Sequence, residues 1–365
     1  MDYINVYEPR KAKNQTKYVL EALESNCISG KAGRFIEEFE ETLAWITGVD
    51  HAVSVCNGTV SLMLIYAAAD LKSGDEVITP SLTYCATVSQ LNWLGITPVL
   101  VDSDDNFQMD LSQLESSISR KTKAIVVPQL YGDAPQMFRL SNFCTKHGLI
   151  LIEDSAECFA STFDEKERVI GSFGLASSFS FFANKNITTG EGGAVATDDP
   201  DFAKRLRLLR SQAHIGNFVH DGPGFNFRMT NLHAAVGVAQ LEEHCDIVTR
   251  KTQIARYYRN KLSESVGKVV PKIHGSTEWM PLFTLPDSMN YPKFLLEMQK
   301  KGIDTRPCFT PIHLMNGFEY TKRVSLDNCE RLYKKGFNLP CYPDLTDEQL
   351  KYVVDSVNEV VEMVG

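Results

Sequence analysis

One lysine stands in a segment that could make its amine reactive. Lys185 follows Ser180 near the end of an apolar strand, and a glycine-rich stretch ending at Gly193 leads into another strand. Flanking aromatic residues and glycines can exclude water from the amine, which lowers its pKa and makes it a nucleophile for a carbonyl carbon. This is the chemistry of a Schiff base. Taken alone, a lysine here is more often an exposed side chain of a hairpin loop.

A carboxylate earlier in the chain gives this lysine a chemical context. Asp154 comes directly after the apolar strand that begins at Leu149. Pyridoxal phosphate is an electron sink only while its ring nitrogen is protonated, so it requires a buried carboxylate at that nitrogen. Ala156 is small enough to let a ring lie against the backbone. Aspartate is also a common helix N-cap, so the residue alone leaves both interpretations open.

Two further segments suit a phosphate group and an aromatic ring. Gly58 and Thr59 follow a strand and open an apolar helical pattern, so their backbone N–H groups should lie at a helix N-terminus, where anions bind. A simple helix cap is the alternative, and no Walker lysine follows. Tyr84, after the next strand, offers a flat face for stacking, although aromatic residues more often pack in a core.

These residues fall at the ends of elements that alternate in the manner of an α/β protein. Apolar, β-branched runs predict seven strands, at residues 52–56, 76–79, 97–102, 124–128, 149–153, 177–181 and 194–197. Amphipathic helical stretches separate them, which favours a mostly parallel sheet buried on both faces. After about residue 250 the pattern changes to short strands, at 268–273 and 281–285, and helices, the last opening with the capping-box spacing of Thr346 and Gln349. We therefore expect a large α/β domain (1–250) and a smaller α+β domain (251–365).

Composition excludes several classes of protein. The 365 residues carry a net charge of −9 with no clustered basic face, which argues against a nucleic-acid partner. Nine singly spaced cysteines indicate neither a disulfide framework nor a zinc or other metal site. No apolar run reaches the length of a membrane helix, and no secretory signal pattern is visible, so we expect a cytoplasmic protein without a membrane partner.

The motifs together resemble the sugar aminotransferases of the aspartate-aminotransferase superfamily, whose fold is called fold type I. The resemblance covers almost the whole chain and is carried by Asn57-Gly58-Thr59, Thr83-Tyr84, Val101-Asp102, Leu130-Tyr131-Gly132-Asp133, Glu153-Asp154-Ser155-Ala156-Glu157, Ser180 to Lys185 with Gly190-Glu191-Gly192-Gly193, Asn226-Phe227-Arg228-Met229, Gly302 to Pro307, and Asn338-Leu339-Pro340. It implies pyridoxal 5'-phosphate, alternating with pyridoxamine phosphate, as the cofactor. Lys185 would form the Schiff base and Asp154 would pair with the ring nitrogen.

The same resemblance implies roles for the remaining cofactor contacts. Tyr84 and Ala156 would lie on the two faces of the ring, with Glu157 near its hydroxyl group. The phosphate would be held by Gly58, Thr59 and Ser180 and, from a neighbouring subunit, by Asn226. A homodimer with shared active sites, which could assemble further, is the expected unit.

Within the family the sequence most resembles the GDP-perosamine synthases, which share the form of residues 184–193. This implies transfer of an amino group, with L-glutamate the expected donor, to GDP-4-keto-6-deoxymannose for surface polysaccharide or lipopolysaccharide synthesis. The loop Phe218–Phe225 keeps a histidine but lacks the tryptophan and proline neighbours of those enzymes. An octulosonate ketone, giving 8-amino-3,8-dideoxy-octulosonate (8-amino-Kdo), is therefore the alternative acceptor.

Other functions fit the sequence less well. Sugar dehydratases of this family carry histidine in place of Lys185, and a cysteine desulfurase would need its cysteine in a glycine-rich loop. A regulator that binds cofactor without turnover would not need Lys185 and Asp154 together. Candidate substrate contacts are Ser29, His220, Arg306 and His313. Arg306 could bind a carboxylate or phosphate through its planar fork, or form an interdomain salt bridge, and the histidines could be structural.

Overall fold

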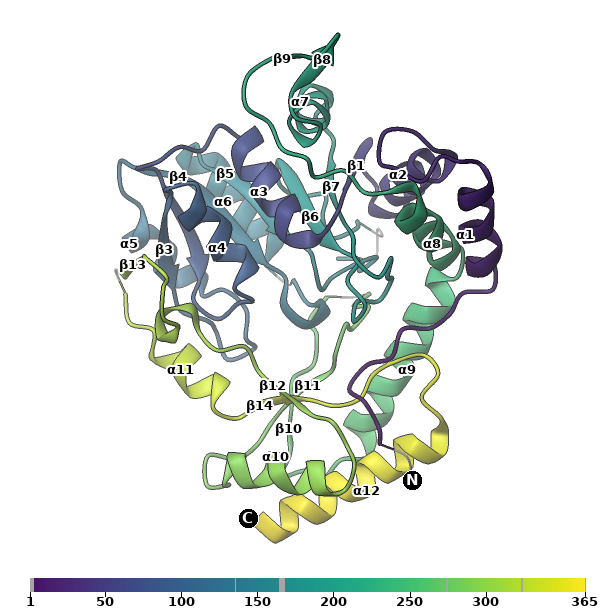
Figure 1. Ribbon diagram of the computed structural model, residues 1–365. Coiled ribbons are helices and arrows are strands. Elements are labelled where there is room, and N and C mark those ends of the chain that lie inside the picture. Colours follow the sequence, from purple (N-terminus) through teal and green to yellow (C-terminus); the bar gives the residue numbers. More distant parts are fainter. Residues whose placement is uncertain (1–2, 135, 164–167, 274, 323, 365) are drawn as a thin grey trace.

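A mostly parallel sheet of eight strands forms the centre of the computed structural model, which describes residues 3–134, 136–163, 168–273, 275–322 and 324–364. Figure 1 shows this sheet with helices on both of its faces. In spatial order its strands are β1 (His51–Val55), β7 (Gly193–Thr197), β6 (Ala176–Ser180), β5 (Ile150–Asp154), β4 (Thr122–Pro128), β2 (Glu76–Pro80), β3 (Thr97–Val101) and β13 (Thr321–Lys322).

All seven strands predicted for this sheet are confirmed. β7 runs antiparallel to both β1 and β6, and the other neighbours are parallel. The eighth strand, β13, was not predicted, because two residues carry no period-two pattern. β13 comes from the C-terminal third of the chain and pairs with β3. The domain boundary expected at residue 250 remains a proposal, and with that boundary one strand of the large sheet would come from the smaller domain.

Burial on both faces explains why these strands read as continuous apolar runs. In β4, Ala124 and Val126 pack with α3 (Gly58–Ala68), α4 (Ala86–Trp93) and α7 (Pro200–Arg210). Ile125 and Val127 point to the opposite face, toward α5 (Leu114–Ser117) and α6 (Met137–His147). Near β1 and β7 that second face is covered by α1 (Gln15–Glu24), α2 (Arg34–Thr47) and α8 (Asn231–Glu242). The result is three layers with a core on each side of the sheet.

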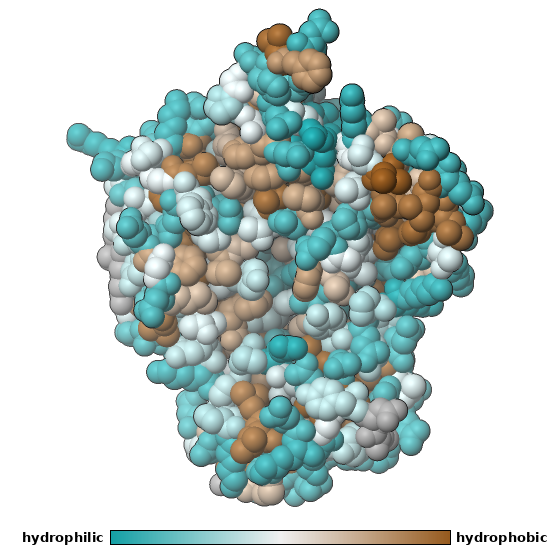
Figure 2. Space-filling view, viewed as in Figure 1, coloured by the Kyte–Doolittle hydropathy of each residue, from teal (hydrophilic) through white to brown (hydrophobic). Residues whose placement is uncertain are grey.

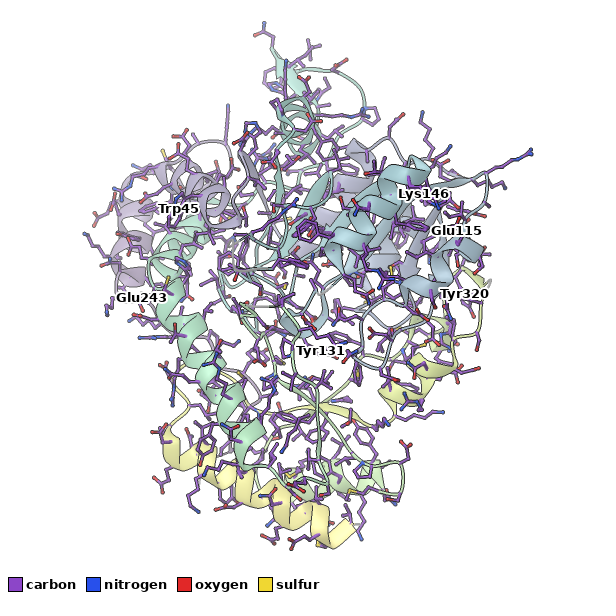
Figure 3. The ribbon with its side chains drawn as sticks, turned by 180° about the vertical axis from the view of Figure 1, so that it is seen from behind. Trp45, Glu115, Tyr131, Lys146, Glu243 and Tyr320 are labelled. Carbon is purple, nitrogen blue, oxygen red and sulfur yellow. The ribbon has the colours of Figure 1, made fainter. Side chains whose placement is uncertain are left out.

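The C-terminal part is built on a smaller antiparallel sheet with strand order β10 (Gly267–Lys268), β11 (Leu282–Thr284), β14 (Gly336–Asn338), β12 (Arg306–Pro307). It shares a core with α9 (His244–Lys261), α10 (Tyr291–Lys300) and α12 (Asp347–Val364), and α11 (Asp327–Tyr333) lies between the two sheets. The first described residues also belong here, since Ile4 packs in this core and pairs with Ile303. Tyr131 lies where the two parts meet (Figure 3).

Two predictions about local structure had different outcomes in this part. The capping box is confirmed: Thr346 and Gln349 each accept, through the side chain, a hydrogen bond from the other's backbone N–H, at 3.1 and 2.9 Å. The strand expected at 268–273 was wrong beyond Lys268. Pro271 cannot donate a ladder hydrogen bond, and the N–H groups of Lys272 and Ile273 instead donate to Oδ1 of Asp133 at 2.9 and 3.1 Å.

A separate two-stranded hairpin, β8 (His214–Gly216) and β9 (Val219–His220), projects from the top of the molecule in Figure 1. In the described part of the chain, no helix combines the length and apolar character needed to cross a bilayer.

Candidate active site

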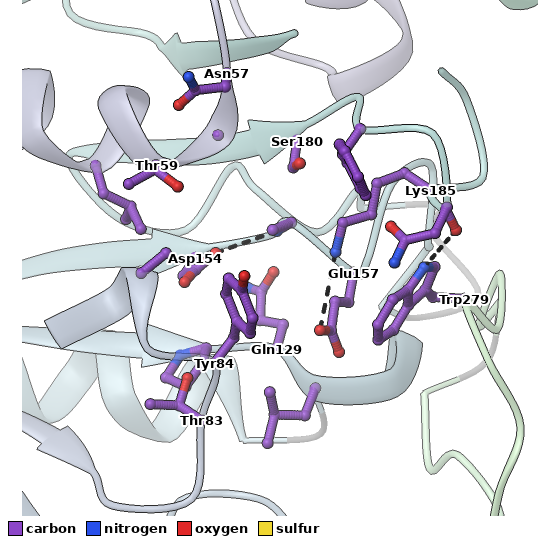
Figure 4. A pocket seen from close by; sticks show the side chains of 18 of the residues that line it. Asn57, Thr59, Thr83, Tyr84, Gln129, Asp154, Glu157, Ser180, Lys185 and Trp279 are labelled. Carbon is purple, nitrogen blue, oxygen red and sulfur yellow. Dashed lines mark hydrogen bonds and ion pairs between the residues drawn. The ribbon is translucent and has the colours of Figure 1, made fainter. Parts of the chain in front are cut away.

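Strands β4, β5 and β6 end at a cavity of about 420 Å³, which is within the range of roughly 300–1,000 Å³ typical of small-molecule pockets. Figure 4 shows its side chains converging from separate elements. Eight residues singled out from the sequence line it together: Gly58, Thr59, Tyr84, Asp154, Ala156, Glu157, Ser180 and Lys185. Such positions, at the carboxyl ends of parallel strands, are where open α/β sheets bind ligands.

Lys185 reaches the cavity from the turn that reverses the chain between β6 and β7. The backbone N–H of Lys185 donates a hydrogen bond to the carbonyl of Phe182 at 2.9 Å. Gly190, with a positive φ of 84°, lets the chain turn back toward β7. Nζ lies 3.9 Å from Oε1 of Glu157 and 4.1 Å from the ring centroid of Trp279. Burial lowers the pKa of Lys185, whereas the charges of Glu157 and Asp154 act in the opposite direction. The amine is therefore shielded from water but held beside acids.

Asp154 is the last residue of β5, and its carboxylate is buried. Its Oδ2 accepts a hydrogen bond from Oγ1 of Thr87 at 2.7 Å, and its Oδ1 accepts one from the N–H of Ala156 at 3.3 Å. Burial raises the pKa of Asp154, and these hydrogen bonds and the charge of Lys185 only partly offset it. A cationic donor in the cavity would favour the ionised form.

A cradle for a phosphate group lies at the N-terminus of α3. Asn57 caps the helix by accepting a hydrogen bond from the N–H of Val60 at 3.0 Å, and the first-turn amides of Gly58 and Thr59 have no intrahelical acceptor. A Cβ at Gly58 would lie 2.7 Å from Cβ of Ser180, so only glycine leaves this space open. The hydroxyl groups of Ser61, in α3, and Ser178, in β6, are hydrogen-bonded to each other.

Pyridoxal phosphate is the group that these residues fit. A helix N-terminus with a glycine and a hydroxyl group suits its phosphate, and a buried carboxylate suits its protonated ring nitrogen. A shielded lysine amine suits its aldehyde. These three features lie in one cavity. Within a single cofactor molecule, Gly58 would hold the phosphate, Asp154 the ring nitrogen and Lys185 the aldehyde.

Glu157 is a buried acid whose environment opposes ionisation. Its Oε2 accepts a hydrogen bond from the N–H of Tyr131 at 2.9 Å. Burial raises the pKa of Glu157 to about 7, the charge of Asp154 adds to the shift, and Lys185 and the Tyr131 N–H oppose it. Glu157 therefore changes charge near neutral pH.

Aromatic side chains bound the cavity on the side of the C-terminal part. Tyr84 is 56% exposed at the rim, and its ring centroid lies 5.7 Å from that of Phe309. Trp279 and Phe309 line the cavity, and both rings lie nearly parallel to that of buried Tyr131. Four residues at the site were not predicted from the sequence: Thr87, Gln129, Trp279 and Phe309. Trp279 and Phe309 lie in segments without periodicity, so only the tertiary fold brings them here.

Five predicted contacts lie outside the lining of this cavity in the described chain: Ser29, His220, Asn226, Arg306 and His313. Ser29, His220, Asn226 and Arg306 are all exposed. Arg306 forms an ion pair with Asp304 at 3.1 Å rather than an interdomain salt bridge. Both ring nitrogens of His313 are hydrogen-bonded, Nδ1 to Ser81 at 2.7 Å and Nε2 to Glu330 at 3.0 Å, which is a structural arrangement.

Comparison with known proteins agrees with this geometry. Residues 9–358 match the model of the DegT/DnrJ/EryC1/StrS aminotransferase family. The chain belongs to this family. It is thus a pyridoxal-phosphate-dependent sugar aminotransferase with a fold type I architecture.

Among its relatives, the GDP-perosamine synthase of Escherichia coli O157:H7 is 39% identical over 370 residues, covering 98% of this chain and 99% of the relative. The GDP-perosamine synthase of Caulobacter vibrioides is 38% identical over 368 residues, covering 98% of both. Helicobacter pylori PseC, an aminotransferase involved in the biosynthesis of pseudoaminic acid, superposes with a TM-score of 0.93 at 28% identity, covering 99% and 100% of the two chains. DesI, solved in the presence of its TDP-sugar product, gives 0.92 at 29% identity, covering 99% and 93%.

Proposed function

We propose that this family member transfers the amino group of an amino acid, L-glutamate in the first instance, to the 4-keto group of GDP-4-keto-6-deoxymannose. The product would be GDP-perosamine, a precursor for surface polysaccharide or lipopolysaccharide. The observation that carries the proposal is the identity of 38–39% to GDP-perosamine synthases from two organisms over 98% of the chain. The octulosonate acceptor is not favoured, because the names of these relatives describe the synthesis of a nucleotide-linked sugar.

Pyridoxal phosphate, when bound, supplies a conjugated ring that accepts the electron pair left when a C–H bond breaks. Nζ of Lys185 is the base in this proposal: it takes the proton from Cα of the amino donor. It would pass this proton to C4′ of the cofactor, and in the second half of the reaction it would take a proton from C4′ and deliver it to C4 of the sugar. Burial lowers the pKa of Lys185, which favours the neutral amine that a general base requires.

The surrounding residues would hold the cofactor in position beside Lys185. Asp154 holds a proton at the ring nitrogen through its buried carboxylate, which Thr87 fixes in place. Gly58, Thr59 and Ser180 would bind the phosphate, and Glu157, which accepts a hydrogen bond from the Tyr131 N–H, would lie near the ring hydroxyl. Tyr84 and Ala156 both line the cavity, and in this proposal they would lie on the two faces of the ring.

We also propose that two copies share their sites, with Asn226 reaching the phosphate of the neighbouring copy. Apolar side chains gather over α1 and on the tip of the β8–β9 hairpin in Figure 2, where Leu20 is 52%, Ile215 60% and Phe218 95% exposed. Exposed apolar areas of this kind mark interfaces. Light scattering should give the mass of two chains or a multiple of two, and a monomer at working concentrations would contradict the proposal. All nine cysteines are unpaired, which suits a reducing cytoplasm.

The acceptor can be identified with the purified, cofactor-loaded chain. L-glutamate would be supplied with GDP-4-keto-6-deoxymannose or, in a parallel reaction, with the octulosonate ketone, and 2-oxoglutarate and the mass of the sugar product would be measured. We expect turnover with the nucleotide sugar. Turnover with the octulosonate alone would replace this proposal by the alternative, and the Lys185→Ala variant sets the background in both reactions.

A further inference from the structure

We propose that Trp279 is a positioning residue for Lys185, acting as part of a support formed by residues 277–279. The inference deepens the proposed function, since it concerns the amine that carries the proton transfers there. Trp279 is 6% exposed and belongs to the chain that leads into β11, so it approaches the lysine from the C-terminal part (Figure 4).

The support contacts the lysine turn on both sides of Lys185. Nε1 of Trp279 donates a hydrogen bond to the carbonyl of Asn184 at 2.8 Å. On the other side, Nδ2 of Asn186 donates to the carbonyl of Thr277 at 3.1 Å. The residues before and after the lysine are thus fixed by one short segment, which limits where the lysine backbone can move.

The segment is itself held rigidly. Oγ1 of Thr277 donates to the carbonyl of Phe159 at 2.6 Å, which ties it to the large domain. Glu278 has a positive φ of 34°, and Arg259 of α9 donates to both of its carboxylate oxygens at 2.5 Å. Backbone strain of this kind persists only where surrounding contacts enforce it, and it concentrates at functional sites.

Trp279 also meets the amine directly. Nζ of Lys185 lies 4.1 Å from the centre of the Trp279 ring, a distance at which an ammonium group is attracted to an aromatic face. The charged groups around this amine are Glu157 at 3.9 Å and Asp154, which favour the ammonium form, and Lys251 of α9, which opposes it. The Trp279 ring, like Glu157 and Asp154, favours the ammonium form, because its face attracts a cation more strongly than a neutral amine.

The test measures the amine of Lys185 without relying on turnover. The full chain, freed of cofactor, would be labelled with traces of acetic anhydride across a pH series, and acetylation at Lys185 would be read by peptide mass spectrometry. Trp279→Leu lacks both the aromatic ring and the N–H donor. In this variant we expect the midpoint of the pH dependence of acetylation at Lys185 to fall by roughly one pH unit. Trp93→Leu is the matched control, because Trp93 is 80% exposed and should leave the midpoint unchanged.

A conservative variant separates the two contributions and covers a failure of Trp279→Leu to fold. Trp279→Phe keeps an aromatic face but loses the N–H donor. Its midpoint for acetylation of Lys185 should therefore stay close to that of the unaltered chain, while amide hydrogen exchange at residues 184–186 becomes faster. An unchanged midpoint in Trp279→Leu, or unchanged exchange in Trp279→Phe, would overturn the proposal. Both readouts concern the protein alone, so they remain interpretable even if the sugar acceptor proves to be another one.

Discussion

Replacing Glu157 by glutamine should remove a pH-dependent loss of stability that is specific to the active site. Burial and the nearby charge of Asp154 raise the pKa of Glu157 from 4.5 to about 7 in the folded chain. The folded state therefore retains a proton that the unfolded state releases in this interval. The stabilisation is fully present below pH 4.5 and is lost as the pH rises through 7.

The magnitude follows from the size of the shift. The difference, 7 − 4.5 = 2.5 units, corresponds to roughly 3 kcal/mol at about 1.36 kcal/mol per unit. Glutamine keeps an oxygen that can accept the Tyr131 N–H but cannot ionise. The free energy of unfolding of Glu157→Gln minus that of the unaltered chain should therefore be constant below pH 4.5 and grow between pH 4.5 and 7. Above pH 7 it should level off roughly 3 kcal/mol higher.

Urea unfolding of the cofactor-free chain, followed by circular dichroism across this pH range, measures the difference directly. Glu41→Gln, on the exposed side of α2, is the matched control and should give a difference that does not vary with pH. If the Glu157→Gln difference is equally flat, the carboxyl group is ionised throughout, and the account of a buried, weakly compensated acid is wrong.

Three further substitutions test other parts of the structure. Lys251→Met should stabilise the chain at pH 7 by roughly 3 kcal/mol in urea unfolding, because burial lowers the pKa of Lys251 from 10.5 to about 8. This gain in stability should disappear above pH 10.5, where the lysine is neutral in both the folded and the unfolded state. An absence of any gain at pH 7 would contradict the prediction. Gly58→Ala should weaken pyridoxal phosphate binding on the order of tenfold in an absorbance titration, since its Cβ would meet Ser180; Gly148→Ala, at an open helix end, should not. Thr87→Val removes the donor to Asp154 while keeping the shape, so kcat should fall severalfold and unfolding free energy by about 1 kcal/mol; an unchanged kcat would show that this hydrogen bond does not matter.

Much of the large sheet could be predicted because its strands are buried on both faces. The run from Ala124 to Val127 is apolar without a break, since alternate residues enter different cores, and such a run predicts a central parallel strand. The edge strand β13 lacked this signal. Two residues paired with β3 owe their conformation to what they pack against, not to their own sequence.

The candidate site divides in the same way. Residues at the carboxyl ends of strands, such as Asp154 and Ser180, could be placed because the strand fixes the position of its last residues. Thr87 and Trp279 could not, because their roles depend on contacts across the fold: one hydroxyl group reaching β5 from α4, and one indole reaching the lysine turn from the C-terminal part. His313 was a plausible substrate contact by type, but its neighbours use both ring nitrogens.

The central claim is that one amine, that of Lys185, is joined to the cofactor. Borohydride reduction of the cofactor-loaded chain, followed by peptide mapping, would locate the bond. The nearby buried lysine of α9, Lys251, provides an internal comparison. The account predicts the label on the peptide that contains Lys185 alone; a label on Lys251 or any other lysine, or no label, would contradict it.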